Sequence, residues 1–166
     1  MLNLKSISKE NWIEVVRLCS SEDQKNKIFE ETIASNCLSI AQASIEDNWR
    51  VKAIYNEKTL IGFTMYGYSD ELIGYEICRL MIDYHFQGNG FGKEALPLIV
   101  EEMKKEYKCT EILICFQPDN IKAKNLYKNF GFKNTGKIIK GNVGLVTLFI
   151  INMVIYLRQR NVNKQI

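Results

Sequence analysis

A glycine-rich loop constrains this chain more than any other stretch. Residues 87–93 read Gln-Gly-Asn-Gly-Phe-Gly-Lys, so single residues separate three glycines. An apolar run that predicts a strand precedes the loop, and the apolar spacing of a helix follows it. Backbone N–H groups converge where a strand turns into a helix in this way, and glycine lets an anion approach closely. The pattern predicts an anion site, although it also fits a tight turn without a ligand.

The same residues exclude two familiar phosphate-binding motifs. No Gly-Lys-Ser/Thr follows the loop, as a P-loop requires. Gly88, Gly90 and Gly92 also have the wrong spacing for the dinucleotide-binding pattern G-x-G-x-x-G. An anion at this loop must therefore be held by a different arrangement.

Length predicts one domain over residues 1–166, and cysteine usage predicts a cytoplasmic location. A chain of 166 residues is long enough to bury one core. Residues 1–8 alternate like a strand and lack the apolar region of a signal peptide. Five cysteines are scattered without a C-x-x-C pair, which indicates reduced, buried thiols rather than disulfides or a zinc site. They are Cys19, Cys37, Cys78, Cys109 and Cys115.

The net charge of +3 hides an asymmetry along the chain. Residues 1–119 carry 13 Lys and Arg against 19 Asp and Glu, whereas residues 120–166 carry nine Lys and Arg and no acid. This division suits a cationic substrate and an anionic cofactor, and it also fits ordinary solvated faces. The nine cations are not organised with aromatic residues into a nucleic-acid-binding module, so no nucleic acid is expected.

Apolar periodicity predicts the element order β-α-α-β-β-β-α-β-α-β. This order fits one α/β domain, a mixed sheet with helices on both faces. Ser8 is expected to cap a first helix whose apolar positions are Trp12, Ile13, Val16 and Cys19. Residues 21–36 predict a second helix or an irregular lid, and a further helix over 38–47 follows Ser35 or Asn36. The predicted strands are 2–7, 51–55, 60–68, 74–82, 111–116 and 133–139.

Two further helices are predicted around the glycine loop and after residue 119. The first runs from the loop to Tyr107, with Pro97 expected in its first turn, where proline is tolerated. The second is capped by Asn120 and ended by Gly131. Residues 143–157 are then almost continuously apolar, but they fall short of the ~20 residues of a spanning helix. They predict an extended final strand, buried in a dimer, with an interfacial anchor as the alternative.

Two motifs together resemble a known enzyme family. Gln87-x-x-Gly90-x-Gly92, followed by Asn120-x-x-Ala123-x-x-Leu126-Tyr127-x-x-x-Gly131-Phe132, is similar to the GCN5-related N-acetyltransferases, the GNAT family. The similarity covers roughly residues 51–139. Within the family, residues 62–67 and 79–83 resemble the bacterial spermine/spermidine acetyltransferases.

The resemblance implies the GNAT fold, with acetyl-CoA lying where two strands of a mostly antiparallel sheet splay apart. It implies backbone contacts to the pantetheine arm from the strand before the loop, with a backbone N–H near Met81 polarising the thioester carbonyl. It also implies a pyrophosphate cradle in the loop, further pantetheine contacts in the next motif, and a cation for the phosphates. The implied cofactor residues are Leu80, Met81, Ile82, Gln87, Gly88, Asn89, Gly90, Phe91, Gly92, Lys93, Asn120, Ala123 and Lys128.

Two residues are expected to carry the chemistry. Tyr127 matches the family's general acid, which protonates the leaving thiolate, although a lone helical tyrosine also fits a core position. Glu76 is the candidate base, because alternation places it on the face of Cys78 and Leu80. Polyamine acetyltransferases tend to carry an acid where this chain has Cys78. Either Glu76 replaces it, or the substrate differs.

The resemblance implies direct transfer of acetyl from acetyl-CoA to a primary amine in a ternary complex. The expected acceptor is a polyamine, with Asp70, Glu71 and the acids around the first helices lining an acidic mouth, and no metal is required. A protein amine, an aminoglycoside, or a non-catalytic acyl-CoA-binding module are the alternatives. His85 is expected at the surface, and the protein is expected to form a homodimer without a membrane partner.

Overall fold

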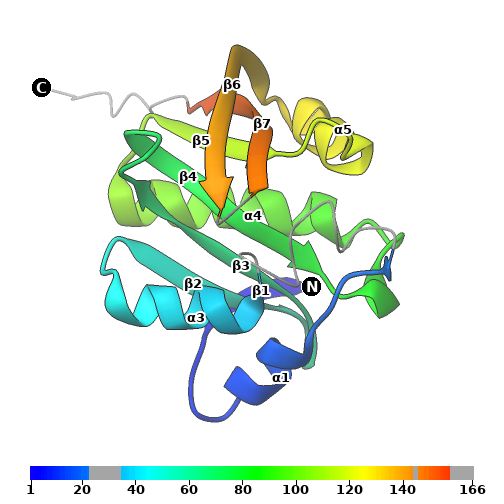
Figure 1. The fold of residues 1–166 in the computed structure, drawn as a ribbon. Helices are drawn as coiled ribbons and strands as arrows, with labels where there is room; N and C mark the ends of the chain where they lie inside the picture. The colour runs from blue at the N-terminus through cyan, green and yellow to red at the C-terminus, as the bar shows by residue number, and fades with distance from the viewer. Residues whose placement is uncertain (23–34, 144–145, 158–166) are drawn as a thin grey trace, which may run out of the picture.

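One seven-stranded sheet organises the molecule (Figure 1). The computed structural model describes residues 1–22, 35–143 and 146–157. The strand order is β1-β2-β3-β4-β5-β7-β6, and every neighbouring pair is antiparallel except β4 with β5. This sheet confirms the predicted fold class. The strands are β1 (Leu2–Ser6), β2 (Trp49–Asn56), β3 (Thr59–Ser69), β4 (Gly74–Ile82), β5 (Glu111–Phe116), β6 (Lys133–Val143) and β7 (Val146–Tyr156).

Helices cover both faces of the sheet (Figure 1). On one face, α1 and α3 pack over a core that includes Val15 and Phe63. On the other face, α4 and α5 pack over a larger core that includes Leu96, Ile112 and Tyr127. The two apolar layers bury both sides of the strands that carry the glycine loop. The helices are α1 (Trp12–Arg17), α3 (Asn36–Ile45), α4 (Phe91–Tyr107) and α5 (Ile121–Phe130), with one 3-10 turn, η1 (Tyr84–Phe86).

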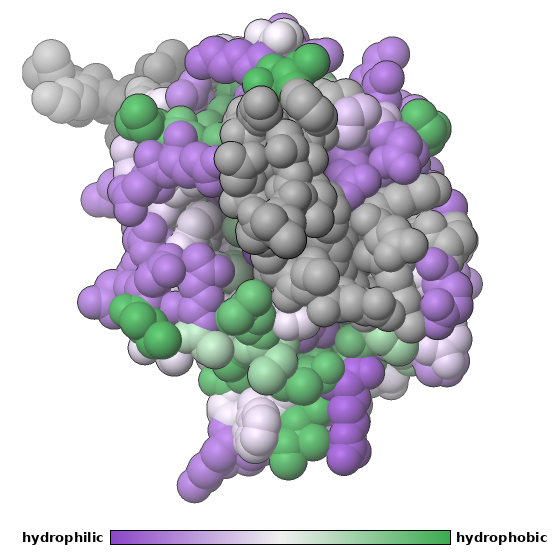
Figure 2. Space-filling model, viewed as in Figure 1, coloured by the Kyte–Doolittle hydropathy of each residue, from purple (hydrophilic) through white to green (hydrophobic). Residues whose placement is uncertain are grey.

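The predicted apolar face of the first helix is wrong. Val15 is fully buried, whereas Trp12 and Ile13 are each 47% exposed. Figure 2 shows apolar surface at the lower end of the molecule, where α1 lies in Figure 1. A helix of six residues has too few turns for its apolar spacing to define one face, so docking against the sheet decides which side is buried. Ser8 accepts hydrogen bonds through its carbonyl from the N–H groups of Asn11 and Trp12, and Asn11 is the N-cap residue.

The other local predictions near the N-terminus are confirmed, with element ends moved by a few residues. Ser35 caps α3 by accepting a hydrogen bond from the N–H of Leu38 at 3.1 Å. β2 and β3 form the predicted hairpin, and β4 has the predicted bounds. The second helix or lid expected over residues 21–36 falls mostly outside the described residues.

Pro97 lies inside α4 rather than in its first turn. The helix begins at Phe91, so Pro97 is its seventh residue. Because proline has no N–H, the carbonyl of Lys93 lacks its usual intrahelical donor there. The helix continues to Tyr107 and ends at Lys108, which has a left-handed backbone with φ of 51°.

The apolar C-terminal run forms the predicted extended strand, β7, which is part of the sheet of its own chain. β7 lies between β5 and β6 and pairs with both, so its backbone is hydrogen-bonded on each edge. Met153 and Val154 are buried at its far end. The backbone pairing of β7 is therefore completed within its own chain, and burial of this strand in a dimer stays a prediction.

Gly67→Ala is expected to lower the free energy of unfolding by about 2 kcal/mol, because an added Cβ would overlap the backbone oxygen of Asn48. Urea denaturation measures this loss. Gly92→Ala is the matched control, since a Cβ there would meet the Leu126 side chain at an ordinary 3.6 Å. A change below about 0.5 kcal/mol for Gly67→Ala would contradict the close approach of Gly67 to the Asn48 backbone.

Candidate active site

The glycine loop presents a row of backbone donors. Gly88 and Gly90 both have φ of 82°, and Gly90 is the N-cap of α4. Among the described residues, no backbone acceptor receives the N–H groups of residues 88–92. A Cβ added at Gly88 or Gly90 would have no atom within 4 Å, so the space beside the loop is open. Five free donors at the start of a 17-residue helix make a strong anion-binding geometry.

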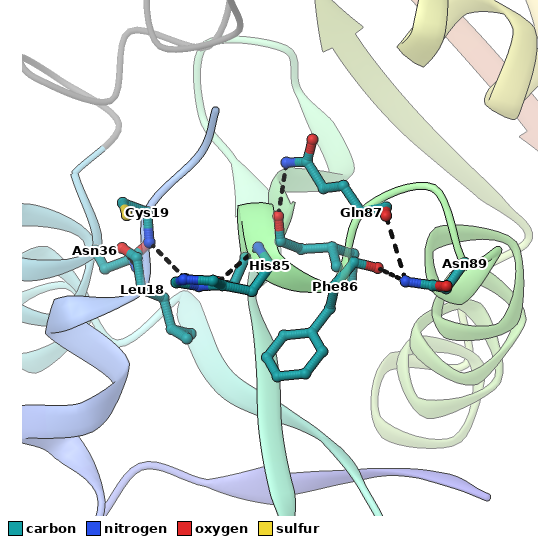
Figure 3. Close-up of polar contacts among 9 residues, drawn as sticks. Leu18, Cys19, Asn36, His85, Phe86, Gln87 and Asn89 are labelled. Carbon is teal, nitrogen blue, oxygen red and sulfur yellow. Dashed lines mark hydrogen bonds and ion pairs between the residues drawn. The ribbon is translucent and has the colours of Figure 1, made fainter. Parts of the chain in front are cut away.

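Side chains of the loop brace its own backbone (Figure 3). Gln87 Nε2 donates to the carbonyl of Ile82 at 2.8 Å. Asn89 Nδ2 donates to the carbonyl of Phe86 at 3.1 Å. Asn89 Nδ2 also donates to the carbonyl of Gln87 at 3.3 Å, so both of its N–H groups are used, whereas Gln87 Nε2 retains a second N–H. A ligand at the loop would therefore meet mainly main-chain N–H groups.

The remaining loop residues connect the loop to α4 and α5. Phe91 packs against the larger core, and Lys93 is exposed. A Cβ at Gly92 would lie 3.6 Å from the side chain of Leu126 in α5. The two motifs that carry the family resemblance therefore lie side by side.

β4 and β5 separate beside the loop. They pair only at Glu76 with Leu113 and at Ile77 with Ile114, whereas β4 stays paired with β3 as far as Ile82. The predicted splayed strand pair is therefore present. From Cys78 onward, the edge of β4 that faces β5 has lost its partner strand.

The direction of each N–H on this free edge follows from the β3–β4 register. The N–H of Asp83 donates to Ile61 of β3, and Met81 pairs with Phe63 two residues earlier in β4. Because successive N–H groups of a strand point to opposite edges, the N–H of Met81 also points to β3. The N–H groups of Leu80 and Ile82 point toward the gap, so these residues rather than Met81 present free donors.

A β-bulge corrects the expected face of Leu80. Met65 pairs with Arg79 and Tyr66 with Ile77, so Cys78 is an extra residue in β4. The bulge reverses the alternation. Cys78 packs toward the α1 and α3 core, whereas Leu80 packs toward the α4 core. Glu76 shares a face with Cys78 as predicted, but not with Leu80.

Glu76 is a buried carboxyl group in a polar cluster. It is 8% exposed, and burial raises its pKa above the usual range. Hydrogen bonding with Cys78 and Ser69 and the charge of Arg79 act in the opposite direction, while Glu71 adds to the rise. Arg79 Nη1 also donates to the Cys78 carbonyl at 2.9 Å. A carboxyl group with a raised pKa retains basicity that an exposed one lacks.

Tyr127 lies across the sheet from Glu76. It is 7% exposed, and its ring centre lies 5.5 Å from that of Phe116 and 5.9 Å from that of Phe132. Burial raises the pKa of its phenol, so the hydroxyl stays protonated. Tyr127 therefore lies on the α4 and α5 face of the sheet, and Glu76 lies on the α1 and α3 face.

Asn120 caps α5 as predicted. Its Oδ1 accepts a hydrogen bond from the N–H of Ala123 at 3.0 Å, which fixes the orientation of the amide. The Nδ2 group is then left as a donor beside the start of α5. Lys128 is exposed in the last turn of α5, on the same helix as Asn120 and Tyr127.

The thiols near Glu76 are poor nucleophiles. Burial raises the pKa of Cys78, and burial with the charge of Glu76 raises the pKa of Cys115 to about 12. Asn152 Nδ2 donates to Cys115 Sγ at 3.4 Å. Since the thiolate is the reactive form of cysteine, the raised pKa values indicate that both thiols stay protonated and have a packing role.

Sequence reasoning missed Asp83 and Asn36, two buried polar residues near the loop. Asp83 Oδ1 lies 2.8 Å from Nδ1 of His85, whose side chain is 63% exposed, as predicted for His85. Asn36 Nδ2 donates to the carbonyl of Val15 at 2.9 Å. An Asp directly after a strand and before a turn is a recognisable cap signal, but its distant partners leave no local signal.

A family profile decides the relationship of this chain to known proteins. The profile of the Acetyltransferase (GNAT) family matches residues 10–132, which is most of the chain. The chain belongs to this family. The match extends from α1 through both motifs to the residue after Gly131, so it includes the loop, the separated strands and α5.

Individual relatives agree with that assignment. The chain is 29% identical over 143 residues to a spermine/spermidine N(1)-acetyltransferase of Bacillus subtilis strain 168, covering 82% of this chain and 91% of that protein. The fold of this chain matches that of a spermidine N-acetyltransferase from Vibrio cholerae solved with CoA and spermine. The TM-score is 0.73 and the identity 19%, covering 93% of this chain and 95% of that one. An aminoglycoside acetyltransferase solved with coenzyme A has a TM-score of 0.72, 14% identity and coverage of 94% and 95%.

Membrane-spanning helices and metal-binding clusters are both absent from the described residues. None of their helices is long and apolar enough to cross a membrane. They also contain no group of three or more His, Cys, Asp or Glu side chains placed to hold a metal ion.

Glu76→Gln is expected to raise the melting temperature at pH 7. The raised pKa means that the folded protein binds this proton more tightly than the unfolded chain, so wild-type stability falls as pH rises above the ordinary carboxyl value. The advantage of Gln should therefore disappear as pH falls toward 4. Thermal melts from pH 4 to 8 measure it, with exposed Glu111→Gln as the control. Equal melting temperatures for wild type and Glu76→Gln at pH 7 would contradict the raised pKa.

Asn120→Ala is expected to lower the free energy of unfolding by about 1 kcal/mol, because the N–H of Ala123 loses its cap. Asn125→Ala, at an exposed position of the same helix, is the control and should change stability by less than about 0.5 kcal/mol. Chemical denaturation compares the two variants. Losses of the same size would argue against the cap.

Proposed function

We propose that this protein transfers the acetyl group of acetyl-CoA to a primary amine of a polyamine such as spermine or spermidine. Attack is direct, in a ternary complex. The observation that carries the proposal is the loss of pairing between β4 and β5 beside a loop of unpaired N–H groups. The family assignment supports acetyl transfer, and the names of the Bacillus and Vibrio relatives support the acceptor.

We propose that the backbone holds most of the cofactor. N–H groups of residues 88–92 suit the pyrophosphate, because they converge at a helix start and no backbone group in the described part of the chain accepts from them. The edge of β4 at Leu80 and Ile82 suits the amides of the pantetheine arm, as an added strand would. One of these two N–H groups also suits the thioester carbonyl and the oxyanion that forms from it. Asn120 Nδ2 is a further donor to the arm, and Lys128 is a candidate cation for the phosphates.

Glu76 is proposed as the general base. An alkyl amine with a pKa of about 10.4 is mostly protonated at neutral pH and must lose a proton before attack. The carboxylate of Glu76 can accept that proton, directly or through a water molecule. Its position on the α1 and α3 face sets the side from which the amine approaches.

Tyr127 is proposed as the general acid. Collapse of the tetrahedral intermediate releases a thiolate, and the phenol can protonate it. Burial in an apolar cluster keeps the hydroxyl protonated until then. Tyr127 and Glu76 lie on opposite faces of the sheet, so acid and base act from different sides.

A polycationic acceptor suits the charges around Glu76. Glu71 lies close enough to raise the pKa of Glu76, so two carboxyl groups share this region. Asp70 is exposed beside Glu71, at the turn that follows β3. We further propose one domain over residues 1–166, a homodimer, and a cytoplasmic location. Asp23, Glu30 and Glu31, in the acidic region between the first helices, lie outside the described residues.

Release of thiol from acetyl-CoA tests the proposal. The amines are spermine, spermidine, putrescine, a lysine peptide and kanamycin. Saturable turnover is expected with spermine or spermidine, and Tyr127→Phe should lower kcat at least tenfold, because a positioned acid contributes roughly 10²–10⁴ in rate. Its affinity for acetyl-CoA should stay within about threefold of wild type. Exposed Tyr156→Phe is the matched control and should keep full activity.

Each of the other outcomes would change a different part of the proposal: the acceptor, the activity or the acid. Turnover with the peptide or kanamycin alone would replace the polyamine by another amine. Binding of acetyl-CoA without turnover of any amine would favour the non-catalytic module. Full activity of Tyr127→Phe would remove Tyr127 from the mechanism and leave acetyl transfer in place.

A further inference from the structure

Asp83 lies where β4 ends and η1 begins, and the proposed chemistry does not use it. The residue is only 5% exposed. A buried carboxylate is costly unless donors surround it. Its Oδ2 accepts from the N–H of Cys19 at 3.0 Å, and its Oδ1 lies 3.1 Å from the backbone N and 2.8 Å from Nδ1 of His85. Asp83 therefore joins η1 to the segment that follows α1, 64 positions earlier.

The main chain doubles this connection. The N–H of Tyr84 donates to the carbonyl of Cys19 at 2.9 Å. On the far side of Cys19, Asn36 Nδ2 donates to the carbonyl of Leu18 at 3.2 Å. The segment that leaves α1 is thus fixed to α3 through Asn36 and to η1 through Asp83.

Hydrogen bonds continue from Asp83 into the glycine loop (Figure 3). The carbonyl of Asp83 accepts from the N–H of Phe86 at 2.9 Å, and Tyr84 accepts from Gln87 at 3.4 Å. Asn89 then donates to Phe86 and Gln87, at 3.1 and 3.3 Å. Figure 3 shows Cys19 on one side of His85 and the loop residues Gln87 and Asn89 on the other.

We propose that Asp83 is a positioning residue that couples the glycine loop to the segment after α1. The inference rests on the proposed binding of CoA at this loop. α1 and α3 cover the face that carries Glu76, so this segment lies on the proposed acceptor side of the sheet. Binding of CoA at the loop then makes the segment after α1 more ordered. Order in that segment strengthens CoA binding by the same factor, because a coupling free energy between two sites is reciprocal.

Hydrogen–deuterium exchange of the full chain with and without CoA tests the coupling without any amine. Binding of CoA should slow exchange in peptides that cover residues 15–20 at least threefold in the wild type. Asp83→Asn keeps the side-chain size but replaces one acceptor oxygen by a donor group, so it cannot accept from both Cys19 and His85. In this variant the protection at residues 15–20 should disappear, and affinity for CoA should fall about tenfold.

Two control variants separate the coupling from other effects of the substitution. Exposed Asp47→Asn should retain wild-type protection and affinity. Gly90→Ala should weaken CoA binding, because its φ of 82° disfavours a side chain, and at saturating CoA it should still protect residues 15–20. A purely structural role for Asp83 predicts a lower melting temperature with unchanged affinity and protection, and this result would overturn the proposal.

Failure of this inference is separable from failure of the proposed function. Calorimetry first measures CoA binding to the wild type. Absence of binding would overturn the proposed function together with this inference. Binding that leaves exchange at residues 15–20 unchanged would overturn the coupling alone, whatever amine the protein acetylates.

Discussion

The parting of β4 from β5 is the constraint on which the rest of the site depends. Two residue pairs hold these parallel strands together, and the pairing stops where Cys78 is added to β4. The N–H groups of Leu80 and Ile82, which a continuous sheet would pair, are thereby left as donors toward the gap. Because unpaired backbone groups are costly when buried, a gap of this kind persists where water or a ligand can satisfy them. The bulge also turns Glu76 and Leu80 to different faces.

Burial then gives the two ionisable side chains different properties. Tyr127 lies among aromatic rings on the α4 side, where desolvation keeps its proton bound. Glu76 lies in a polar cluster on the other side, where desolvation raises its pKa and nearby donors limit the rise. Tyr127 therefore keeps its proton at neutral pH, and Glu76 binds a proton more readily than an exposed carboxylate does. The sheet keeps these two environments apart.

Local signals explain which features the sequence could predict. Alternating glycines locate the loop, and an Asn three residues before an Ala N–H locates the cap of α5. The bulge at Cys78 left no such signal, because it depends on the register with β3. The partner of Asp83 is 64 positions away, and the buried side of α1 is set by docking rather than by its own spacing. Local chemistry was therefore predictable, whereas long-range pairing was not.

The position of β7 has a consequence for the order in which the molecule can be completed. β5 forms one wall of the gap, and it pairs with β4 at two positions but with β7 at six. β7 leaves the ribosome after β5, α5 and β6. The N-terminal meander can therefore pair during synthesis, whereas the wall formed by β5 gains most of its hydrogen bonds only when β7 is inserted. The β5 side of the gap is thus a late product of folding, although the glycine loop beside it is encoded in the middle of the chain.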